Sequence, residues 1–260
     1  MADFYNRSVG AVISVTLNKY MYISSHNFFE KDQIRLKYSK TENVKNIADI
    51  QHSIFKAVLS QKEISGIEIS SNADIPAGTG LGSSSSFTVG LLNNLYARNG
   101  KYVSKENLAR EACAIEIDVL GQPIGKQDQY AVAYGGLNVI EFSPNGVAVN
   151  PLHIKKEVYK SLQNNLFLYY TEKKRDSSSI LKTQVKNLQK VDKYNNLKEM
   201  VELVSEARET LYTGNLNEFG KILHKNWKLK QRLADGISNS YINGMYEKGL
   251  ANGASGGKLL

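Results

Sequence analysis

Residues 74–86 read "DIPAGTGLGSSSS", in which three glycines at alternate positions lead into four serines. Because glycine has no Cβ atom, the backbone N–H groups of such a turn can converge on an anion. Serine hydroxyls at the start of a helix can cap it, donate to phosphate oxygens or bind Mg²⁺. The pattern therefore points to a loop that binds a polyphosphate together with its metal ion. A flexible turn followed by a serine-capped helix is the alternative interpretation.

Two acidic residues follow this loop in positions that could do chemistry. Glu116 lies in "CAIEIDVLG", and Asp128 lies in the glycine-bounded segment "GQPIGKQDQYAVAYGG". One carboxylate could hold Mg²⁺ while the other accepts the proton of a substrate hydroxyl. Spacing alone does not select this pair, because Glu111 and Asp118 share the same predicted helix. Each of these acids could also lie on a solvated helix face.

The glycine loop must be positioned by the elements on either side of it. Before it, "SGIEISSNADIP" places Ile67 and Ile69 at alternate positions, which is typical of a strand that ends in a turn at Pro76. After it, "SSFTVGLLNNLYARNG" predicts a helix that Gly100 ends. A second helix is predicted from the N-cap Ser104 to Gly121, and residues 121–136 are predicted to form a loop.

The rest of the chain mixes strands and helices. An amphipathic helix is predicted over residues 46–60, and from Ser177 to about Lys248 the pattern is helical. Strands are predicted within residues 9–25, 33–39, 137–143, 146–154 and 165–171. The apolar segment "NLFLYYT" is the strongest of these. We place a domain boundary near residues 151–165.

Composition is that of a globular protein, with 42% hydrophobic and 22% charged residues. The formal charge of +8 fits nucleic acid, an anionic membrane surface or phosphorylated small molecules as partners. The densest basic cluster, residues 225–232, has helical spacing and is typical of a solvated helix face.

Cys113 is the single cysteine, which excludes an intrachain disulfide, and its helical setting predicts a buried core residue. We find no signal peptide and no apolar run of membrane-spanning length, so we expect a cytoplasmic protein with no membrane partner.

The loop differs from two common phosphate-binding patterns. No Gly-Lys-Ser/Thr is present, and the spacing of Gly78, Gly80 and Gly82 is not G-x-G-x-x-G. Instead, Pro76-x-x-x-Gly80-Leu81-Gly82-Ser83-Ser84 resembles the ATP loop of the GHMP kinase superfamily, and "GKQDQYAVAYGG" is similar to the segment that carries this family's catalytic base. The resemblance extends over nearly all 260 residues.

The resemblance implies a two-domain α+β fold. Its N-terminal, ATP-binding domain (residues 1–155) would contain a left-handed βαβ crossover, and its C-terminal domain (residues 156–260) would be ferredoxin-like. The implied cofactors are ATP and Mg²⁺. Asp128 would be the base, and Ser84 (or Ser83) and Glu116 would bind the metal. A separate hypothesis, based on position alone, is that Lys126, two residues before Asp128, neutralises phosphate charge or lowers the pKa of Asp128. The implied nucleotide-binding residues are Pro76, Gly78, Thr79, Gly80, Leu81, Gly82, Ser83, Ser84 and Ser85.

Several segments, including "FYNRSVGAVISVTLNKYMYI" and "LFLYYTEKKRDSSSIL", resemble the heptose-phosphate branch of this family. This resemblance implies transfer of the ATP γ-phosphate to the anomeric hydroxyl of a heptose 7-phosphate, for nucleotide-activated heptose and the lipopolysaccharide type of surface glycan. Arg175 is the candidate for binding the substrate phosphate, since its planar guanidinium suits that group. An exposed basic loop is the alternative for Arg175, and fucose-type or galactose-type kinases are the alternatives for the substrate.

Relatives have an additional strand before "DFYNRSVGAV" and a glycine-rich continuation after "NGASGGKLL". By resemblance, the chain is thus a GHMP kinase trimmed at both ends, for which we expect reduced stability and weak or no activity. A nucleotide-binding protein without catalytic activity is one rival hypothesis. A basic nucleic-acid-binding protein is another, although the sequence has no motif of a known nucleic-acid-binding module.

Overall fold

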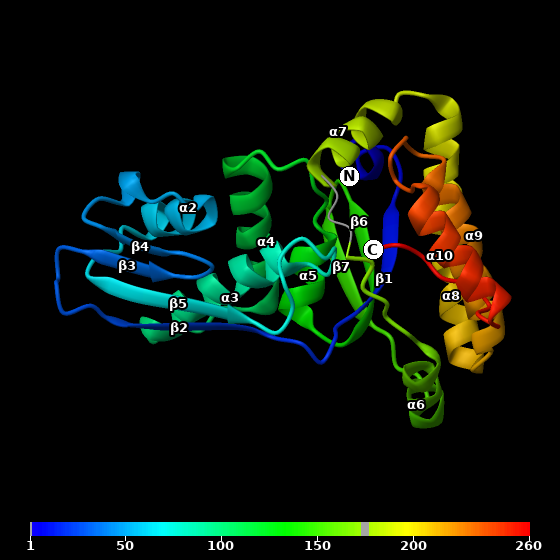
Figure 1. Ribbon diagram of the computed structural model, residues 1–260, viewed down its shortest axis with the longest axis horizontal. Coiled ribbons are helices and arrows are strands. Elements are labelled where there is room, and N and C mark those ends of the chain that lie inside the picture. Colours follow the sequence, from blue (N-terminus) through cyan, green and yellow to red (C-terminus); the bar gives the residue numbers. More distant parts are fainter. Residues whose placement is uncertain (1, 173–176) are drawn as a thin grey trace. The chain divides into compact units, whose positions relative to one another are not determined.

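Helices and two separate β-sheets make up the computed structural model, which describes residues 2–172 and 177–260 (Figure 1). The chain divides into two compact units. One unit consists of residues 16–135, and the other combines residues 1–15 with residues 136–260.

A four-stranded sheet forms the framework of the unit 16–135. Its strands are β2 (Met21–Asn27), β3 (Ile34–Lys37), β4 (Thr41–Val44) and β5 (Ile67–Ala73), in the order β2-β5-β3-β4. β5 pairs antiparallel with β2 and parallel with β3. Because parallel neighbours need a long connection, the chain between β3 and β5 passes through β4 and a helix.

Helices cover one face of this sheet. They are η1 (Ile47–Asp49), α2 (Ser53–Lys62), α3 (Ser83–Arg98), α4 (Lys105–Cys113), the π-helix η2 (Ala114–Val119) and α5 (Gln127–Tyr134). Ile67 and Ile69 of β5 pack with Phe55 of α2 and Leu91 of α3 in one buried apolar cluster. α3 therefore lies against the sheet with its first turn directly after the glycine loop.

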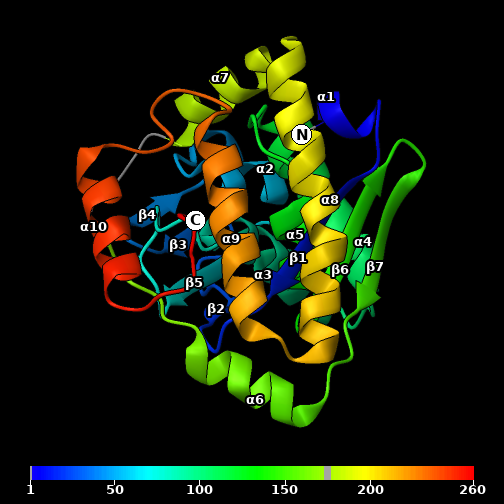
Figure 2. The ribbon, with the colours of Figure 1, turned by 90° about the vertical axis from the view of Figure 1, so that its right-hand side faces the viewer.

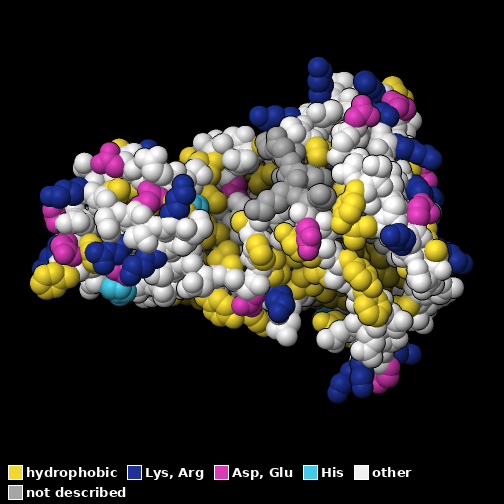
Figure 3. All heavy atoms as spheres, viewed as in Figure 1, with side chains coloured by type: hydrophobic (Ala, Val, Ile, Leu, Met, Phe, Trp, Pro, Cys, Tyr) yellow, Lys and Arg dark blue, Asp and Glu magenta, His cyan; other side chains and the backbone are white. Residues whose placement is uncertain are grey.

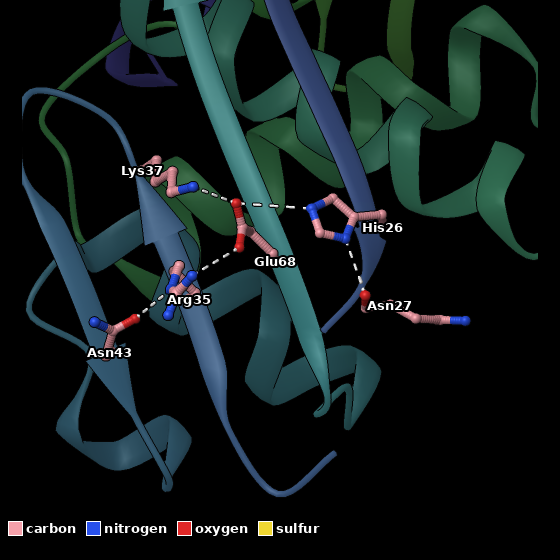
Figure 4. A network of polar contacts seen from close by, with 6 residues as sticks. All are labelled: His26, Asn27, Arg35, Lys37, Asn43 and Glu68. Carbon is pink, nitrogen blue, oxygen red and sulfur yellow. Dashed lines mark hydrogen bonds and ion pairs between the residues drawn. The ribbon is translucent and has the colours of Figure 1, made fainter. Parts of the chain in front are cut away.

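The opposite face of the sheet is polar, because successive side chains of a strand point to opposite faces. Glu68, between the two core isoleucines, is buried on this face (Figure 4). Its carboxylate forms ion pairs with Lys37 Nζ at 2.5 Å and with Arg35 Nη1 at 3.4 Å. The Lys37 hydrogen bond is the main cause of a lowered pKa for Glu68.

A three-stranded antiparallel sheet belongs to the other unit. It consists of β1 (Gly10–Val15), β6 (Leu137–Ser143) and β7 (Gly146–Pro151), in the order β1-β6-β7. Gly10 lies opposite Phe142, and Val15 lies opposite Leu137. A strand from the start of the chain thus pairs with one that follows the whole 16–135 unit.

Six helices of this unit lie in the described part of the chain. They are α1 (Ala2–Tyr5), α6 (Lys156–Asn165), α7 (Ser177–Asn187), α8 (Val191–Thr213), α9 (Leu216–Gln231) and α10 (Ser240–Ala251). Figure 2 shows α8 and α9 side by side, and they share a core that contains Leu203 and Ile222. Trp227 of α9 is buried with Ile237 and with Ile242 of α10.

Two predictions of secondary structure are wrong. Residues 127–134, within the predicted loop, form α5. The strongest predicted strand, over residues 165–171, is absent: Asn165 ends α6, residues 166–171 form neither helix nor strand, and the side chains from Leu166 to Tyr170 are exposed. The local sequence favours a strand there, but a strand needs a hydrogen-bonded neighbour, and no neighbour pairs with this segment among the described residues.

The mixed α and β composition agrees with the expected class, and the strands predicted around β1, β2, β3, β5, β6 and β7 are confirmed. Within residues 156–172 and 177–260 the structure contains helices and no strand. The compact units group residues 136–155 with the later helices. The division into domains 1–155 and 156–260 therefore stays a prediction. No helix in the described ranges is both long and apolar enough to cross a membrane.

Candidate active site

The glycine loop takes a backbone conformation that side chains disfavour. Gly78, Gly80 and Gly82 have φ angles of 81°, 77° and 71°. Left-handed backbone costs other residues free energy, so glycine at alternate positions lets the chain turn repeatedly in a short distance. Asp74 fixes the base of the loop, since its backbone N–H donates to Tyr20 O and its side chain accepts from Tyr20 N–H at 2.9 Å.

The start of α3 offers free backbone donors. Gly82 is the N-cap and supplies no side-chain cap, and the first helical hydrogen bond runs from Ser86 N to Gly82 O at 2.8 Å. The N–H groups of Ser83, Ser84 and Ser85 come before this first bond in the chain, so the helix itself provides no acceptor for them. Together with the positive end of the helix dipole, these amides suit a phosphate group.

Glu116 is the buried carboxylate of the site, with 1% of its surface exposed. Its Oε1 accepts a 2.5 Å hydrogen bond from the Ser84 hydroxyl, and its Oε2 accepts a 2.6 Å hydrogen bond from Gln129 Nε2. Glu116 lies in the π-helix η2, where the backbone bonds run from Leu120 N to Ile115 O and from Gln122 N to Glu116 O. A π-helix inserts extra residues per turn and is often found at functional sites.

The other two candidate acids, Glu111 of α4 and Asp118 of η2, form no hydrogen bond with Ser84 in the described residues. Glu111 forms an ion pair with Lys62 Nζ at 2.6 Å and accepts from the Tyr96 hydroxyl at 2.7 Å. Asp118 is exposed. Of these three acids, Glu116 is the one hydrogen-bonded to Ser84 in the described residues, and its role as a metal ligand stays a prediction.

Asp128 lies beside the glycine loop in the first turn of α5. A Cβ atom placed on Gly82 would lie 3.8 Å from Asp128 Cβ and 3.9 Å from its Cγ. The carboxylate is exposed, whereas the next residue, Gln129, is fully buried. Gly82, Ser84, Glu116 and Asp128 therefore converge although they come from three separate elements.

Lys126 immediately precedes α5 and lies close enough to Cys113 to favour its thiolate. Burial has the larger effect and raises the pKa of the Cys113 thiol to about 12. The prediction that Cys113 is a buried core residue is confirmed. The effect of Lys126 on phosphate or on Asp128 stays a prediction. Arg175 lies outside the described residues.

Two further residues at the site were missed in the sequence. Gln129 falls in the segment that the sequence predicts as a loop, whereas the structure places it in the first turn of α5. Its neighbours in the sequence give no signal that its side chain is buried. Lys19 lines a small cleft together with Tyr20, Leu81 and Ser83. Its position depends on the pairing of β2 with β5, which brings the segment before β2 next to the loop.

The residues at this site fit Mg²⁺ bound together with a polyphosphate. Within the described residues no group of three or more His, Cys, Asp or Glu could hold a metal by itself. Mg²⁺ in nucleotide sites commonly uses one or two protein oxygens, with phosphates and water as its other ligands. Glu116 Oε1 and Ser84 Oγ provide such a pair of hard oxygens next to amides suited to phosphate.

Comparison with known families gives a match to the GHMP kinases N terminal domain over residues 45–136. Residues 45–136 are thus similar to the N-terminal domain of GHMP kinases. The glycine loop, Ser84, Glu116, Asp128 and Gln129 all fall within these matched residues, whereas Lys19 and Tyr20 precede them.

Two curated proteins and one solved structure are similar to a larger part of the chain. D-glycero-alpha-D-manno-heptose 7-phosphate kinase of Campylobacter jejuni is 29% identical over 213 residues, which cover 81% of this chain and 63% of that protein. The bifunctional fucokinase/GDP-fucose pyrophosphorylase of Arabidopsis thaliana is 27% identical over 187 residues, covering 70% of this chain and 18% of that protein. The chain thus spans less than two thirds of the length of both relatives.

The solved structure of a D-glycero-D-manno-heptose 1-phosphate kinase from Bacteroides thetaiotaomicron has a TM-score of 0.71 at 23% identity. The match covers 89% of this chain and 74% of that one. This likeness confirms the expected two-domain α+β fold class of GHMP kinases.

Proposed function

We propose that this protein is an ATP-dependent kinase that phosphorylates a sugar hydroxyl. The observation that carries the proposal is the convergence of the left-handed glycine loop, the Ser84–Glu116 hydrogen bond and Asp128 next to Gly82. A phosphate site, a metal site and a base are the three parts that phosphoryl transfer requires. The named activities of the relatives support the same reaction class.

In the proposed mechanism, the loop amides of residues 78–85 bind the triphosphate of ATP. Ser84 and Glu116 would hold Mg²⁺, which, when bound, neutralises charge on the phosphates. Asp128 would orient the acceptor hydroxyl and accept its proton as the oxygen attacks the γ-phosphorus, while the bond from the γ-phosphorus to the bridging oxygen breaks and ADP leaves. Catalysis would come mainly from positioning and charge neutralisation, since the protein itself forms no covalent bond.

The substrate we favour is D-glycero-D-manno-heptose 7-phosphate, phosphorylated at its anomeric hydroxyl. The Campylobacter relative named for this activity supports the choice, and Arg175 is our candidate for the 7-phosphate. Because 29% identity leaves room for another sugar, fucose-type and galactose-type substrates stay as alternatives. A product of this kind would feed nucleotide-activated heptose and surface glycans, and we expect the enzyme to work in the cytoplasm.

The rival nucleic-acid-binding function has less support. On the face shown in Figure 3, Lys and Arg side chains stand singly or in small groups with acidic and uncharged side chains between them. A nucleic-acid-binding surface usually gathers its basic residues into a patch or stripe. The other rival is a nucleotide-binding protein without catalytic activity. It would bind ATP at the same site and would differ from a kinase only in not transferring the phosphate.

The test is an ADP-release assay with ATP and Mg²⁺ against heptose 7-phosphate, fucose, galactose and mannose. We expect ADP release that depends on one sugar and that falls by about 10²–10⁴-fold in the Asp128→Asn variant. Unchanged turnover in that variant would reject Asp128 as the base.

Binding measurements separate the rivals. Tight ATP binding without sugar-dependent ADP release would favour the inactive nucleotide-binding protein. Salt-sensitive binding to random DNA, without ATP binding, would favour the nucleic-acid hypothesis.

A further inference from the structure

We infer that Gln129 is a positioning residue that holds the Glu116 carboxylate for the metal ion, an inference that rests on the proposed function. Gln129 is fully buried, and its Nε2 donates to Glu116 Oε2 at 2.6 Å. Ser84 binds the other oxygen, Oε1, at 2.5 Å. The carboxylate is therefore fixed at both oxygens by residues of two different helices.

The two contacts differ in what can replace them. Ser84 is exposed, so its hydroxyl can turn toward a phosphate or a cation that arrives from solvent. Gln129 has none of its surface exposed, so its contact with Oε2 is shielded from bulk water. Gln129 thereby fixes the plane of the carboxylate, and Oε1 is the oxygen left beside the Ser84 hydroxyl for a metal ion.

A neutral amide suits this task better than a cation. A buried carboxylate needs donors, and Lys or Arg would supply them while cancelling the negative charge that attracts Mg²⁺. Within the described residues, none of the ion pairs involves Glu116. An amide donor satisfies Oε2 and leaves the charge available.

The amide oxygen of Gln129 is in a different position from its nitrogen. Gln129 Oε1 is buried and accepts no hydrogen bond in the described structure. Buried polar atoms without partners are rare and call for an explanation. The amide therefore donates to Glu116 although its own oxygen has no partner among the described residues.

The location of Gln129 links the two acids of the site. It follows Asp128 directly in the first turn of α5, so one helical turn presents Asp128 toward the glycine loop and Gln129 toward Glu116. Mutation of a residue that hydrogen-bonds to a metal ligand commonly lowers metal affinity by about 10–100-fold.

The experiment compares the wild-type protein with Gln129→Met, which keeps the length of the side chain and removes the donor. Affinity for the non-hydrolysable β,γ-imido analogue of ATP is measured with EDTA and with saturating Mn²⁺, and bound Mn²⁺ is counted by electron paramagnetic resonance. We expect the gain in affinity that Mn²⁺ provides to fall by about 10–100-fold, while the affinity in EDTA changes little. A merely structural role would lower both affinities together.

Two further variants keep the result interpretable. Gln129→Asn retains a buried amide that is too short to reach Glu116, so it should show the same metal-specific loss if Gln129→Met fails to fold. Gln127→Met changes an exposed glutamine of the same helix and should bind like the wild type.

A double variant tests whether Gln129 acts through Glu116. Glu116→Gln combined with Gln129→Met should lose no more Mn²⁺-dependent affinity than Glu116→Gln alone, since coupled residues are not additive. Additive losses, or Gln129 variants that bind Mn²⁺ and nucleotide like the wild type, would overturn the inference and leave the kinase proposal intact. A wild-type protein without any Mn²⁺-dependent gain would instead reject the proposed metal site, and the inference with it.

Discussion

The hydroxyl of Ser84 donates a 2.5 Å hydrogen bond to the buried carboxylate of Glu116, although the two residues are 32 positions apart in the sequence. This contact joins the first turn of α3 to the π-helix η2. It brings an exposed hydroxyl and a buried carboxylate to the edge of the glycine loop.

The Ser84→Ala variant should lose metal-dependent nucleotide binding. We expect affinity in the presence of Mg²⁺ to fall by about tenfold or more, because one of two protein oxygens is removed. Stability should change little, since water can reach the exposed position of the missing hydroxyl. Titration of a fluorescent ATP analogue with and without Mg²⁺ measures the effect. Ser83→Ala serves as the comparison, and a larger metal-dependent loss in that variant would move the ligand from Ser84 to Ser83.

The Gly82→Ala variant should lose both stability and nucleotide affinity. A side chain at φ 71° costs about 1–2 kcal/mol, and its Cβ would contact Asp128. Gly100→Ala is a matched control, since Gly100 has φ 63° at the other end of α3 and nothing lies within 4 Å of an added Cβ. Thermal unfolding should shift similarly in both variants, and ATP affinity should fall in Gly82→Ala alone. Equal ATP affinity in the two variants would contradict a phosphate-binding role for the loop.

The Glu68→Gln variant should change the dependence of stability on pH. The pKa of Glu68 is lowered from its ordinary value of 4.5, mainly by Lys37, so the folded state favours the charged carboxylate (Figure 4). Its contribution to stability is therefore present above about pH 4.5 and is lost as the pH falls through the lowered pKa. We expect the variant to unfold at a lower temperature than the wild type at pH 7, with the difference shrinking in acid. A difference in melting temperature that stays constant from pH 7 to acid would refute this assignment.

The Arg175→Ala variant should weaken binding of a phosphorylated sugar. Loss of a charge-assisted contact to phosphate is expected to raise the KM for heptose 7-phosphate by about 10–100-fold, with little change in kcat. The same sugar without its 7-phosphate provides the control, because its KM should not respond to the substitution. An unchanged KM for heptose 7-phosphate would leave Arg175 without a role in substrate binding.

Much of the fold was predictable because its signals are local. Alternating isoleucines predict β5, and the glycines that permit left-handed backbone predict the loop before α3. The segment 166–170 shows the limit of such signals, because its side chains favour a strand and yet remain exposed. Whether an extended segment becomes a strand depends on a hydrogen-bonding neighbour, which local sequence does not specify.

For the candidate site, the glycine loop, the serines that follow it and a short set of candidate acids were predictable from residue types and their spacing. These features depend on backbone conformation and residue chemistry within a few positions. Which acid contacts Ser84 depends on the packing of the helices. Lys62 and Tyr96 bind the Glu111 carboxylate, whereas Glu116 accepts a hydrogen bond from Ser84. The structure also places Gln129 at the site. Its burial and its contact with Glu116 depend on how α5 packs against α3 and η2. The physical reason is that burial and hydrogen-bond partners are properties of packed elements, and a linear pattern does not contain them.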